Sequence, residues 1–252
     1  MGKVKFPADA GPGAPTRCEH SSPSDFSPIV HLIYLHGFAS SPQSGKVRFL
    51  SDRLAEHGLT CLCPDLNQPD FSTLTVSRMI DQVEAAVRQL PPEPVVLFGS
   101  SLGAFVALHL AERAALGGGL PPDQLKQLIF LAPALDFGSS RTRLGDRGLA
   151  HWRKTGWLEM THYAYGAARR VHYELFADAS RYDSFSALNT VPTLIVQGAR
   201  DDVVDPKMVE RFALSRPHVR LVMVDDGHQL AASLNRVWSE TQACLGLNPS
   251  AS

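Results

Sequence analysis

The stretch from Val95 to Phe105 reads VVLFGSSLGAF and places two adjacent serines where a run of apolar residues stops. Residues Val95 to Phe98 form a short continuous apolar run, which is typical of a strand buried on both faces. After Ser101 the apolar residues recur at helical spacing, with good helix formers between them. The segment therefore predicts a buried strand, a tight turn and a helix.

Two glycines, Gly99 and Gly103, flank Ser101 in a Gly-x-Ser-x-Gly pattern. In a nucleophile elbow the serine occupies a strained turn, and side chains at the two flanking positions would collide with neighbouring backbone. We therefore expect the Ser101 hydroxyl to project from the sheet at a helix N-terminus, and Ser100 to point back into the turn. About one chain in ten of this length would carry the pattern by chance, so the pattern alone does not identify Ser101 as a nucleophile. The residues that would act together with Ser101 must be found as well.

The chain has 252 residues, which is long enough for one large α/β domain with a substantial core. Lys and Arg total 24 and Asp and Glu total 25, so no basic surface favours a nucleic-acid partner. Residues 1–28 are rich in Pro, Gly, Ser and Asp and predict a flexible arm. Residues 29–252 are predicted to form a single domain.

The N-terminus lacks the apolar region of a secretory signal, and no apolar run is long enough to span a bilayer. The four cysteines, Cys18, Cys61, Cys63 and Cys244, do not have the spacing of a zinc site. We therefore expect a reduced, cytoplasmic protein with no metal and no membrane span.

Apolar strand patterns alternate with amphipathic helix patterns along most of the chain. This order predicts a doubly wound, mostly parallel α/β sheet, and such sheets bind ligands beyond the carboxyl ends of their strands. The predicted strands lie at residues 29–35, 59–66, 95–98 and 125–135 and in the segments that start at 192 and 219; the clearest predicted helices lie at 46–58, 75–90 and 229–245.

One segment, about 136–190, interrupts this alternation with aromatic residues and arginines and contains no buried strand pattern. We interpret it as an inserted, mainly helical cap over the carboxyl edge of the sheet. Trp152, Trp157 and Tyr163 are candidates for the wall of a substrate pocket, although they could instead form the small core of the cap itself.

Ser101 needs a base to become a nucleophile, and the base needs a carboxylate to orient it. His228 follows the last predicted strand, and Asp201 and Asp202 follow the strand before it. The chain order Ser, Asp, His is the order found in α/β-hydrolase sheets. The positions of these three residue types thus predict a catalytic triad.

We favour Asp201 as the acid, because it is closer than Asp202 to the end of its strand. We expect Val203 to lie in the wall of the site. Asp202 is expected to cap the helix that starts near Pro206. Asp136, after the preceding strand, is a third candidate, because an acid at that position could reach the same imidazole.

The oxyanion of a tetrahedral intermediate needs donors that already face it. The backbone N–H of Leu102 and the backbone N–H of Phe38 are the predicted donors. Gly37 would let this loop approach the elbow, and His36 is expected to brace the loop rather than to react.

Three motifs together resemble the α/β-hydrolase superfamily of serine esterases, and especially the small bacterial esterases of the YqiA/YcfP type. They are YLHGFASSPQSGK (34–46), PDLNQPDFS (64–72) and GSSLGA (99–104). The resemblance implies hydrolysis of a small-molecule carboxylic ester or thioester without a cofactor, with Ser101, Asp201 and His228 as nucleophile, acid and base. The cap looks longer and more aromatic than in the smallest members, which leaves substrate size open.

Other functions remain as alternatives at this point. The GSSLG elbow is also similar to that of palmitoyl-thioesterase-like hydrolases, so an acyl-protein or acyl-CoA thioesterase, or an acyltransferase, is possible. A non-catalytic ligand-binding protein on the same scaffold is a third alternative. Gly45 and Lys46 do not belong to a phosphate-binding loop, because no glycine lies five residues before Gly45.

Overall fold

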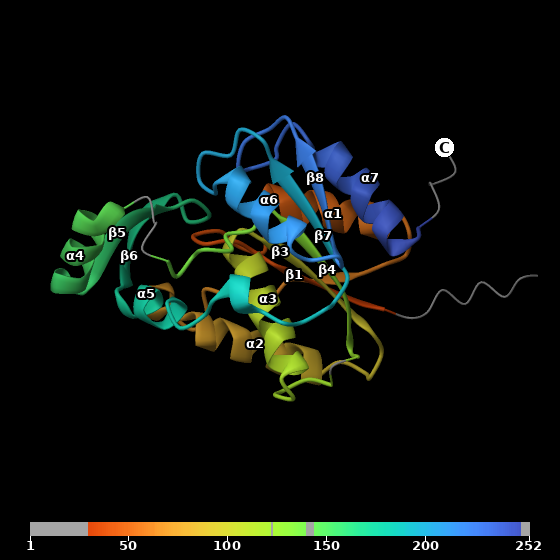
Figure 1. Ribbon diagram of the computed structural model, residues 1–252, viewed down its shortest axis with the longest axis horizontal. Helices are drawn as coiled ribbons and strands as arrows, with labels where there is room; N and C mark the ends of the chain where they lie inside the picture. The colour runs from red at the N-terminus through yellow and green to blue at the C-terminus, as the bar shows by residue number, and fades with distance from the viewer. Residues whose placement is uncertain (1–29, 122, 140–143, 248–252) are drawn as a thin grey trace, which may run out of the picture.

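Six parallel strands form the central sheet of the computed structural model, which describes residues 30–121, 123–139 and 144–247 (Figure 1). The strand order is β2-β1-β3-β4-β7-β8. This arrangement confirms the predicted doubly wound α/β sheet. The strands are β1 (His31–Leu35), β2 (Cys61–Leu62), β3 (Val95–Ser100), β4 (Leu125–Leu131), β7 (Thr193–Gly198) and β8 (Val219–Val224).

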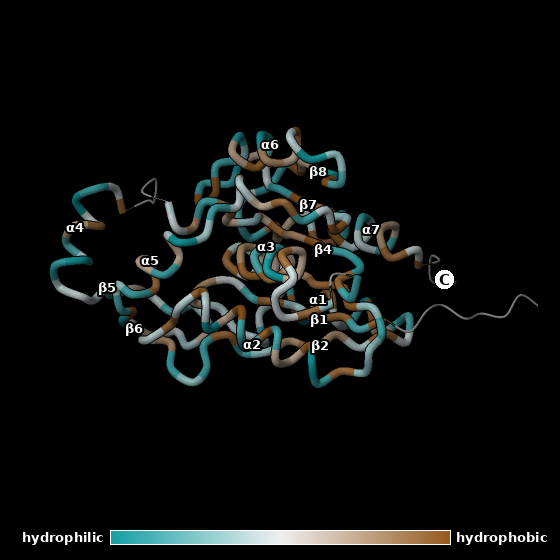
Figure 2. The backbone as a smooth tube through the Cα atoms, turned by 60° about the horizontal axis from the view of Figure 1, so that its bottom comes forward, coloured by the Kyte–Doolittle hydropathy of each residue, from teal (hydrophilic) through white to brown (hydrophobic). Residues whose placement is uncertain are grey.

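Helices cover both faces of the sheet and create two core layers. One face packs against α1 (Gly45–Ala55) and α7 (Leu234–Leu245). The other packs against α2 (Val76–Arg88), α3 (Leu102–Ala115) and α6 (Pro206–Leu214). β3 is buried along its whole length, so its apolar residues pack into the core on both faces of the sheet. Figure 2 shows hydrophobic residues concentrated on the central strands.

The register of the strands aligns the loops that carry the predicted site residues. Leu35 at the end of β1 pairs with Gly99 in β3, and Gly99 pairs with Phe130 in β4. At the other half of the sheet, Gly198 at the end of β7 pairs with Val224 at the end of β8. The loops after β1, β3, β7 and β8 therefore leave the sheet at the same edge.

The cap between β4 and β7 contains α4 (Gly145–Thr155), α5 (Glu174–Ala179) and a short 3-10 turn (Ser184–Ser186). It also contains an antiparallel hairpin of β5 (Trp157–His162) and β6 (Ala167–His172), which the sequence pattern did not predict. Most hairpin residues are only partly buried, so the strands lack the continuous apolar run of the core strands. The cap thus contains helices as expected, but a hairpin that was not expected forms a substantial part of it.

Buried polar contacts attach the cap to the body of the protein. Asp178 in α5 accepts hydrogen bonds from the Ser77 N–H (2.7 Å) and the Ser77 hydroxyl (2.6 Å) at the start of α2. The Tyr182 hydroxyl lies 2.7 Å from the same Ser77 oxygen. Because these groups are largely shielded from water, the contacts fix the position of α5 over α2.

The predicted N-terminal arm, residues 1–28, lies outside the described residues, as does Cys18. Within the described ranges, Cys61, Cys63 and Cys244 are free thiols. None of the helices in the described part of the chain has the length and apolar character needed to cross a bilayer.

Candidate active site

Ser101 occupies the turn between β3 and α3 in the geometry of a nucleophile elbow. Its backbone angles, φ 53° and ψ −114°, lie in a region that non-glycine residues rarely adopt. A Cβ added to Gly99 would overlap the backbone of Ala104, and one added to Gly103 would overlap the Leu35 carbonyl. The two glycines therefore allow α3 to start directly against the sheet, as the sequence pattern predicts.

His228 and Asp201 form the hydrogen-bonded pair that the chain order predicts. His228 Nδ1 lies 2.9 Å from Asp201 Oδ2, and the Asp201 side chain is fully buried. The other carboxylate oxygen, Oδ1, accepts the N–H groups of Val203 (2.8 Å) and Val204 (2.9 Å). These bonds fix the carboxylate, so that the His228 Nδ1 carries the proton and Nε2 is left as the base.

The pKa of Asp201 reflects two opposing effects. Burial of the carboxyl raises its pKa, whereas hydrogen bonds from His228 and from two backbone N–H groups lower it, and the net result is a lowered pKa. Asp201 is thus an anion at neutral pH and can stabilise the imidazolium that forms when His228 takes a proton.

The other two candidate acids take different positions. Asp202 lines the cavity. The prediction that Asp202 caps α6 was wrong: the N-cap of α6 is Asp205, whose side chain accepts the Lys207 N–H. Asp136 also lines the cavity, while His228 pairs with Asp201. The competing predictions for the acid are therefore not supported by the geometry.

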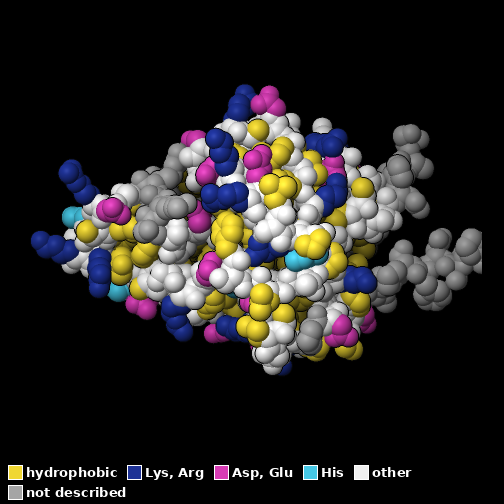
Figure 3. All heavy atoms as spheres, viewed as in Figure 1, with side chains coloured by type: hydrophobic (Ala, Val, Ile, Leu, Met, Phe, Trp, Pro, Cys, Tyr) yellow, Lys and Arg dark blue, Asp and Glu magenta, His cyan; other side chains and the backbone are white. Residues whose placement is uncertain are grey.

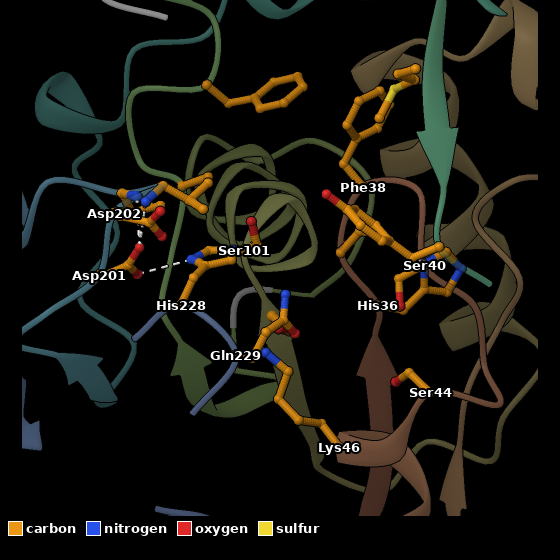
Figure 4. A pocket seen from close by; sticks show the side chains of 18 of the residues that line it. His36, Phe38, Ser40, Ser44, Lys46, Ser101, Asp201, Asp202, His228 and Gln229 are labelled. Carbon is orange, nitrogen blue, oxygen red and sulfur yellow. Dashed lines mark hydrogen bonds and ion pairs between the residues drawn. The ribbon is translucent and has the colours of Figure 1, made fainter. Parts of the chain in front are cut away.

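Ser101 and His228 line the same cavity, and Figure 4 shows both side chains in its central part. Within the described residues the Ser101 hydroxyl makes no hydrogen bond with His228. Hydrogen bonds of this kind are often long in free enzymes and shorten when the substrate binds. The arrangement brings a hydroxyl, an imidazole and a carboxylate to one edge of the sheet.

The predicted oxyanion donors lie on two loops that approach each other closely. A Cβ added to Gly37 would lie 3.2 Å from the Ser100 carbonyl oxygen and 3.3 Å from the Ser101 Cβ. In the described part of the chain, neither the Phe38 nor the Leu102 N–H donates to a protein acceptor. Both groups are thus available to a ligand oxygen next to Ser101.

His36 holds this loop in place, as expected from the sequence. Its Nδ1 lies 2.9 Å from the Gly37 carbonyl oxygen, and its Nε2 accepts the Leu66 N–H at 3.0 Å. Asn67 Nδ2 donates to the Ser40 carbonyl at 2.8 Å. Burial lowers the pKa of His36, so the ring stays neutral and keeps this tautomer. The motif at 64–72 therefore acts as a brace for the loop after β1.

A cavity of about 1340 Å³ lies between the cap and the edge of the sheet. This volume exceeds the 300–1,000 Å³ of ordinary small-molecule sites and is large enough for a substantial acyl or alcohol group. Its cap side is mostly apolar, with Asp136, Glu159 and Tyr163 as polar exceptions, and Phe38 of the loop after β1 adjoins it. The apolar lining residues of the cap are Phe137, Leu144, Trp152, Leu158, Met160, Leu175 and Phe176.

The four predicted pocket residues have different outcomes. Trp152, Tyr163 and Val203 line the cavity. The Trp152 ring also packs edge-on against Tyr173 with 5.7 Å between centroids, so it serves the core of the cap as well. Trp157 is not among the lining residues; its ring packs against His172 and beneath the Arg170 guanidinium, on the other side of the hairpin. The prediction for Trp157 was therefore wrong.

Lys46 is a cavity residue that sequence reasoning set aside. It lies in the first turn of α1 and lines the cavity beside Ser44 (Figure 4). Burial lowers the pKa of its ammonium group to about 8, although the charges of Asp201 and Asp226 act to raise it. The sequence feature that could have identified Lys46 as a cavity residue was its position in the motif at 34–46, next to the predicted oxyanion loop.

The described residues contain no cluster of three or more His, Cys, Asp or Glu side chains that could hold a metal ion. What the site offers chemically is a hydroxyl on a strained turn, an imidazole with a fixed tautomer, and two backbone donors. Groups of these types suit acyl transfer to serine.

The fold places the protein in the α/β-hydrolase class. A provisionally assigned hydrolase from Agrobacterium vitis S4 superimposes with a TM-score of 0.75 at 25% identity, covering 86% of this chain and 88% of that one. The protein Est1E from Butyrivibrio proteoclasticus, with ferulic acid bound, gives a TM-score of 0.68 at 20% identity, covering 86% of this chain and 88% of that one. Alpha/beta hydrolase domain-containing protein 10 from mouse gives 0.70 at 18% identity, with 86% and 89% covered.

Residues 31–241 match the model of the family described as "Uncharacterised protein family (UPF0227)". The chain belongs to this family. The match and the shared fold confirm the resemblance to α/β-hydrolase esterases, and they support hydrolase activity.

Proposed function

We propose that this protein is a serine hydrolase that cleaves carboxylic esters or thioesters through an acyl-enzyme on Ser101. The observation that carries the proposal is the His228–Asp201 hydrogen bond of 2.9 Å in the cavity that also contains Ser101. An oriented imidazole beside a serine on a nucleophile elbow is the arrangement that activates a hydroxyl.

In the proposed reaction, His228 Nε2 accepts the Ser101 proton as Ser101 Oγ attacks the acyl carbonyl carbon. The Phe38 and Leu102 N–H groups bind the oxyanion of the tetrahedral intermediate. His228 then donates the proton to the departing alcohol or thiol, and the acyl group stays on Ser101. Water, deprotonated by His228, attacks the acyl-enzyme; as the bond from the acyl carbon to Ser101 Oγ breaks, His228 returns the proton to Ser101 Oγ and the acid is released.

The apolar cap side of the cavity supports an acyl group longer than acetyl. Each buried methylene contributes about 0.8 kcal/mol, which corresponds to roughly fourfold in kcat/KM. We expect kcat/KM for 4-nitrophenyl esters to rise from acetate to octanoate. The measurement is a chain-length series on the purified protein, compared with octanoyl-CoA to separate ester from thioester preference.

Two residues of β5 provide a matched pair for this series. Met160 lines the cavity and Trp157 does not. Met160→Ala should lower kcat/KM for the octanoate ester about three- to tenfold with a smaller effect on acetate, because it removes apolar contact area. Trp157→Ala should leave the profile unchanged. A flat chain-length profile in the native protein would contradict an acyl site beneath the cap.

A further inference from the structure

Among the described residues, the end of the cavity away from the cap is polar and is lined by a single cation, Lys46. It lies between the N-terminus of α1, the loop before α6 and the loop before α7, and Figure 4 shows the Lys46 side chain extending from α1 toward Gln229. The described residues offer Lys46 no hydrogen bond and no ion pair within the usual distances. A cation that faces a cavity without a close counter-ion is available to bind an anion.

Neighbouring groups would assist Lys46 in such a role. Ser44 caps α1 and accepts the Val47 N–H, which leaves the hydroxyl proton of Ser44 free to be donated. The N-terminus of this 11-residue helix adds its own positive potential. Tyr34, buried beneath, also lines the cavity; its hydroxyl has no hydrogen bond of ordinary geometry within the described chain, with the Ser100 side chain beside it.

The surrounding charges limit which anion would fit. The charges of Asp201 and Asp226 act on Lys46, and Asp202 and Asp205 line the same end of the cavity. The Lys46 ammonium group attracts an anion, while these carboxylates repel it, and they repel a phosphate dianion or a polyphosphate more strongly than a group with a single negative charge. A carboxylate carries a single negative charge.

We infer that Lys46 recognises a carboxylate on the substrate, so that the enzyme prefers esters that carry an acid group within reach of the scissile bond. The inference rests on the proposed function, because it assigns the substrate class of the same site. Because the nearby carboxylates repel phosphates, we also expect acyl-CoA esters to be poorer substrates than free monoesters. Lys46 would act as a specificity-determining residue, separate from the nucleophile, acid and base.

The test compares matched esters with and without a carboxylate. Mono-4-nitrophenyl glutarate against 4-nitrophenyl hexanoate places the charge on the acyl side, and 4-acetoxybenzoate against 4-acetoxybenzamide places it on the alcohol side. We expect the native protein to prefer the anionic ester of at least one pair. Lys46→Met should reduce that preference about ten- to a hundredfold, the size expected for a charged hydrogen bond, while Lys46→Arg should retain most of it.

Lys207 provides the matched control. It is exposed and is the second residue of α6, as Lys46 is of α1, and it does not line the cavity. Lys207→Met should leave both members of each pair within about twofold of the native values, because an exposed charge contributes little. Thermal unfolding of each variant shows whether its fold is intact.

The native protein gives a second readout that needs no variant. Lys46 is charged below its pKa of about 8 and neutral above it, so the anionic preference should be present at pH 7 and fall away between pH 8 and 10. Titration of other cavity groups affects both esters of a pair and largely cancels in their ratio. The titratable and charged residues that line this cavity are Tyr34, His36, Asp136, Glu159, Tyr163, Asp201, Asp202, Asp205 and His228, of which Glu159 is exposed on the outer face of β5, and Asp226 acts on Lys46 by its charge.

The outcomes separate this inference from the proposed function. If Lys46→Met lowers anionic and neutral esters equally, Lys46 serves only as a counter-charge for nearby acids, and the inference is wrong. A native protein that hydrolyses neutral esters but shows no anionic preference at pH 7 would also overturn it. If no ester is hydrolysed faster than by Ser101→Ala, the proposed function fails and the inference fails with it.

Discussion

Ser101→Ala should lower kcat/KM for the best ester by about 10³- to 10⁶-fold, the range seen when a serine nucleophile is removed. Among the serines that the structure describes, Ser101 is the one that combines a strained φ of 53° with a place on the cavity wall, at the start of α3. The substitution removes the attacking oxygen while leaving the turn and its glycines in place. Initial rates on the purified variant, with active-site titration of the native protein, measure the loss.

Ser100→Ala is the control for this result. Ser100 is buried at the end of β3, with its side chain beside the Tyr34 hydroxyl. We expect its removal to change kcat/KM by less than about fivefold, because a buried neutral contact contributes only modestly. If Ser100→Ala were inactive and Ser101→Ala active, the assignment of the nucleophile would be reversed.

Asp201→Asn should lower kcat by about 10³- to 10⁴-fold, the loss known for this substitution in serine proteases. The amide cannot stabilise an imidazolium, and its N–H₂ group can donate to His228, which favours the wrong tautomer. The bonds from Val203 and Val204 to Asp201 Oδ1 can persist in the variant, so the fold should be preserved. Kinetics together with circular dichroism and thermal unfolding distinguish lost catalysis from lost structure.

The neighbouring residue supplies the comparison, since Asp202→Asn makes the same chemical change one position away. Asp202 is exposed, and His228 pairs with Asp201. We expect Asp202→Asn to retain kcat within about threefold, as for an exposed charge near but outside the triad. Equal losses in the two variants would show that the acid is not the one seen in the structure.

The strand, turn and helix around Ser101 could be predicted because their signals are local. An apolar run ends at two small residues, and helical periodicity begins immediately afterwards. The His228 and Asp201 positions followed from a topological rule, since parallel strands place their following loops at one edge of the sheet. The choice of Asp201 over Asp202 rested on its position nearest the strand end, and the hydrogen bond agrees with it.

The cap could be located from the sequence, but its internal structure could not. Its strands are short and half exposed, so they lack the apolar run that identified the core strands. Side chains alternate between the two faces of a strand. Leu158 and Met160 therefore line the cavity, while Trp157 faces outward beneath Arg170. The sequence did not reveal the hairpin, so it could not show which face of the cap Trp157 occupies, and the prediction that Trp157 lines the pocket was wrong.

Lys46 could not be recognised because its surroundings come from distant parts of the chain. Its sequence neighbours suggested only a phosphate-binding loop, which the glycine spacing excludes. The loops before α6 and α7, more than 150 residues away in sequence, build the rest of its end of the cavity. Figure 3 shows other Lys and Arg side chains at the outer surface of the cap and body, where solvent screens them.

In the proposed mechanism His228, oriented by its hydrogen bond to Asp201, makes the Ser101 hydroxyl reactive. Peptide mass mapping of the native protein after reaction with a fluorophosphonate tests it most directly. We expect one adduct per chain, located on Ser101 and formed at pH 7 without added metal or cofactor. An adduct on another residue, or a folded native protein that stays unmodified, would show that Ser101 is not an activated nucleophile.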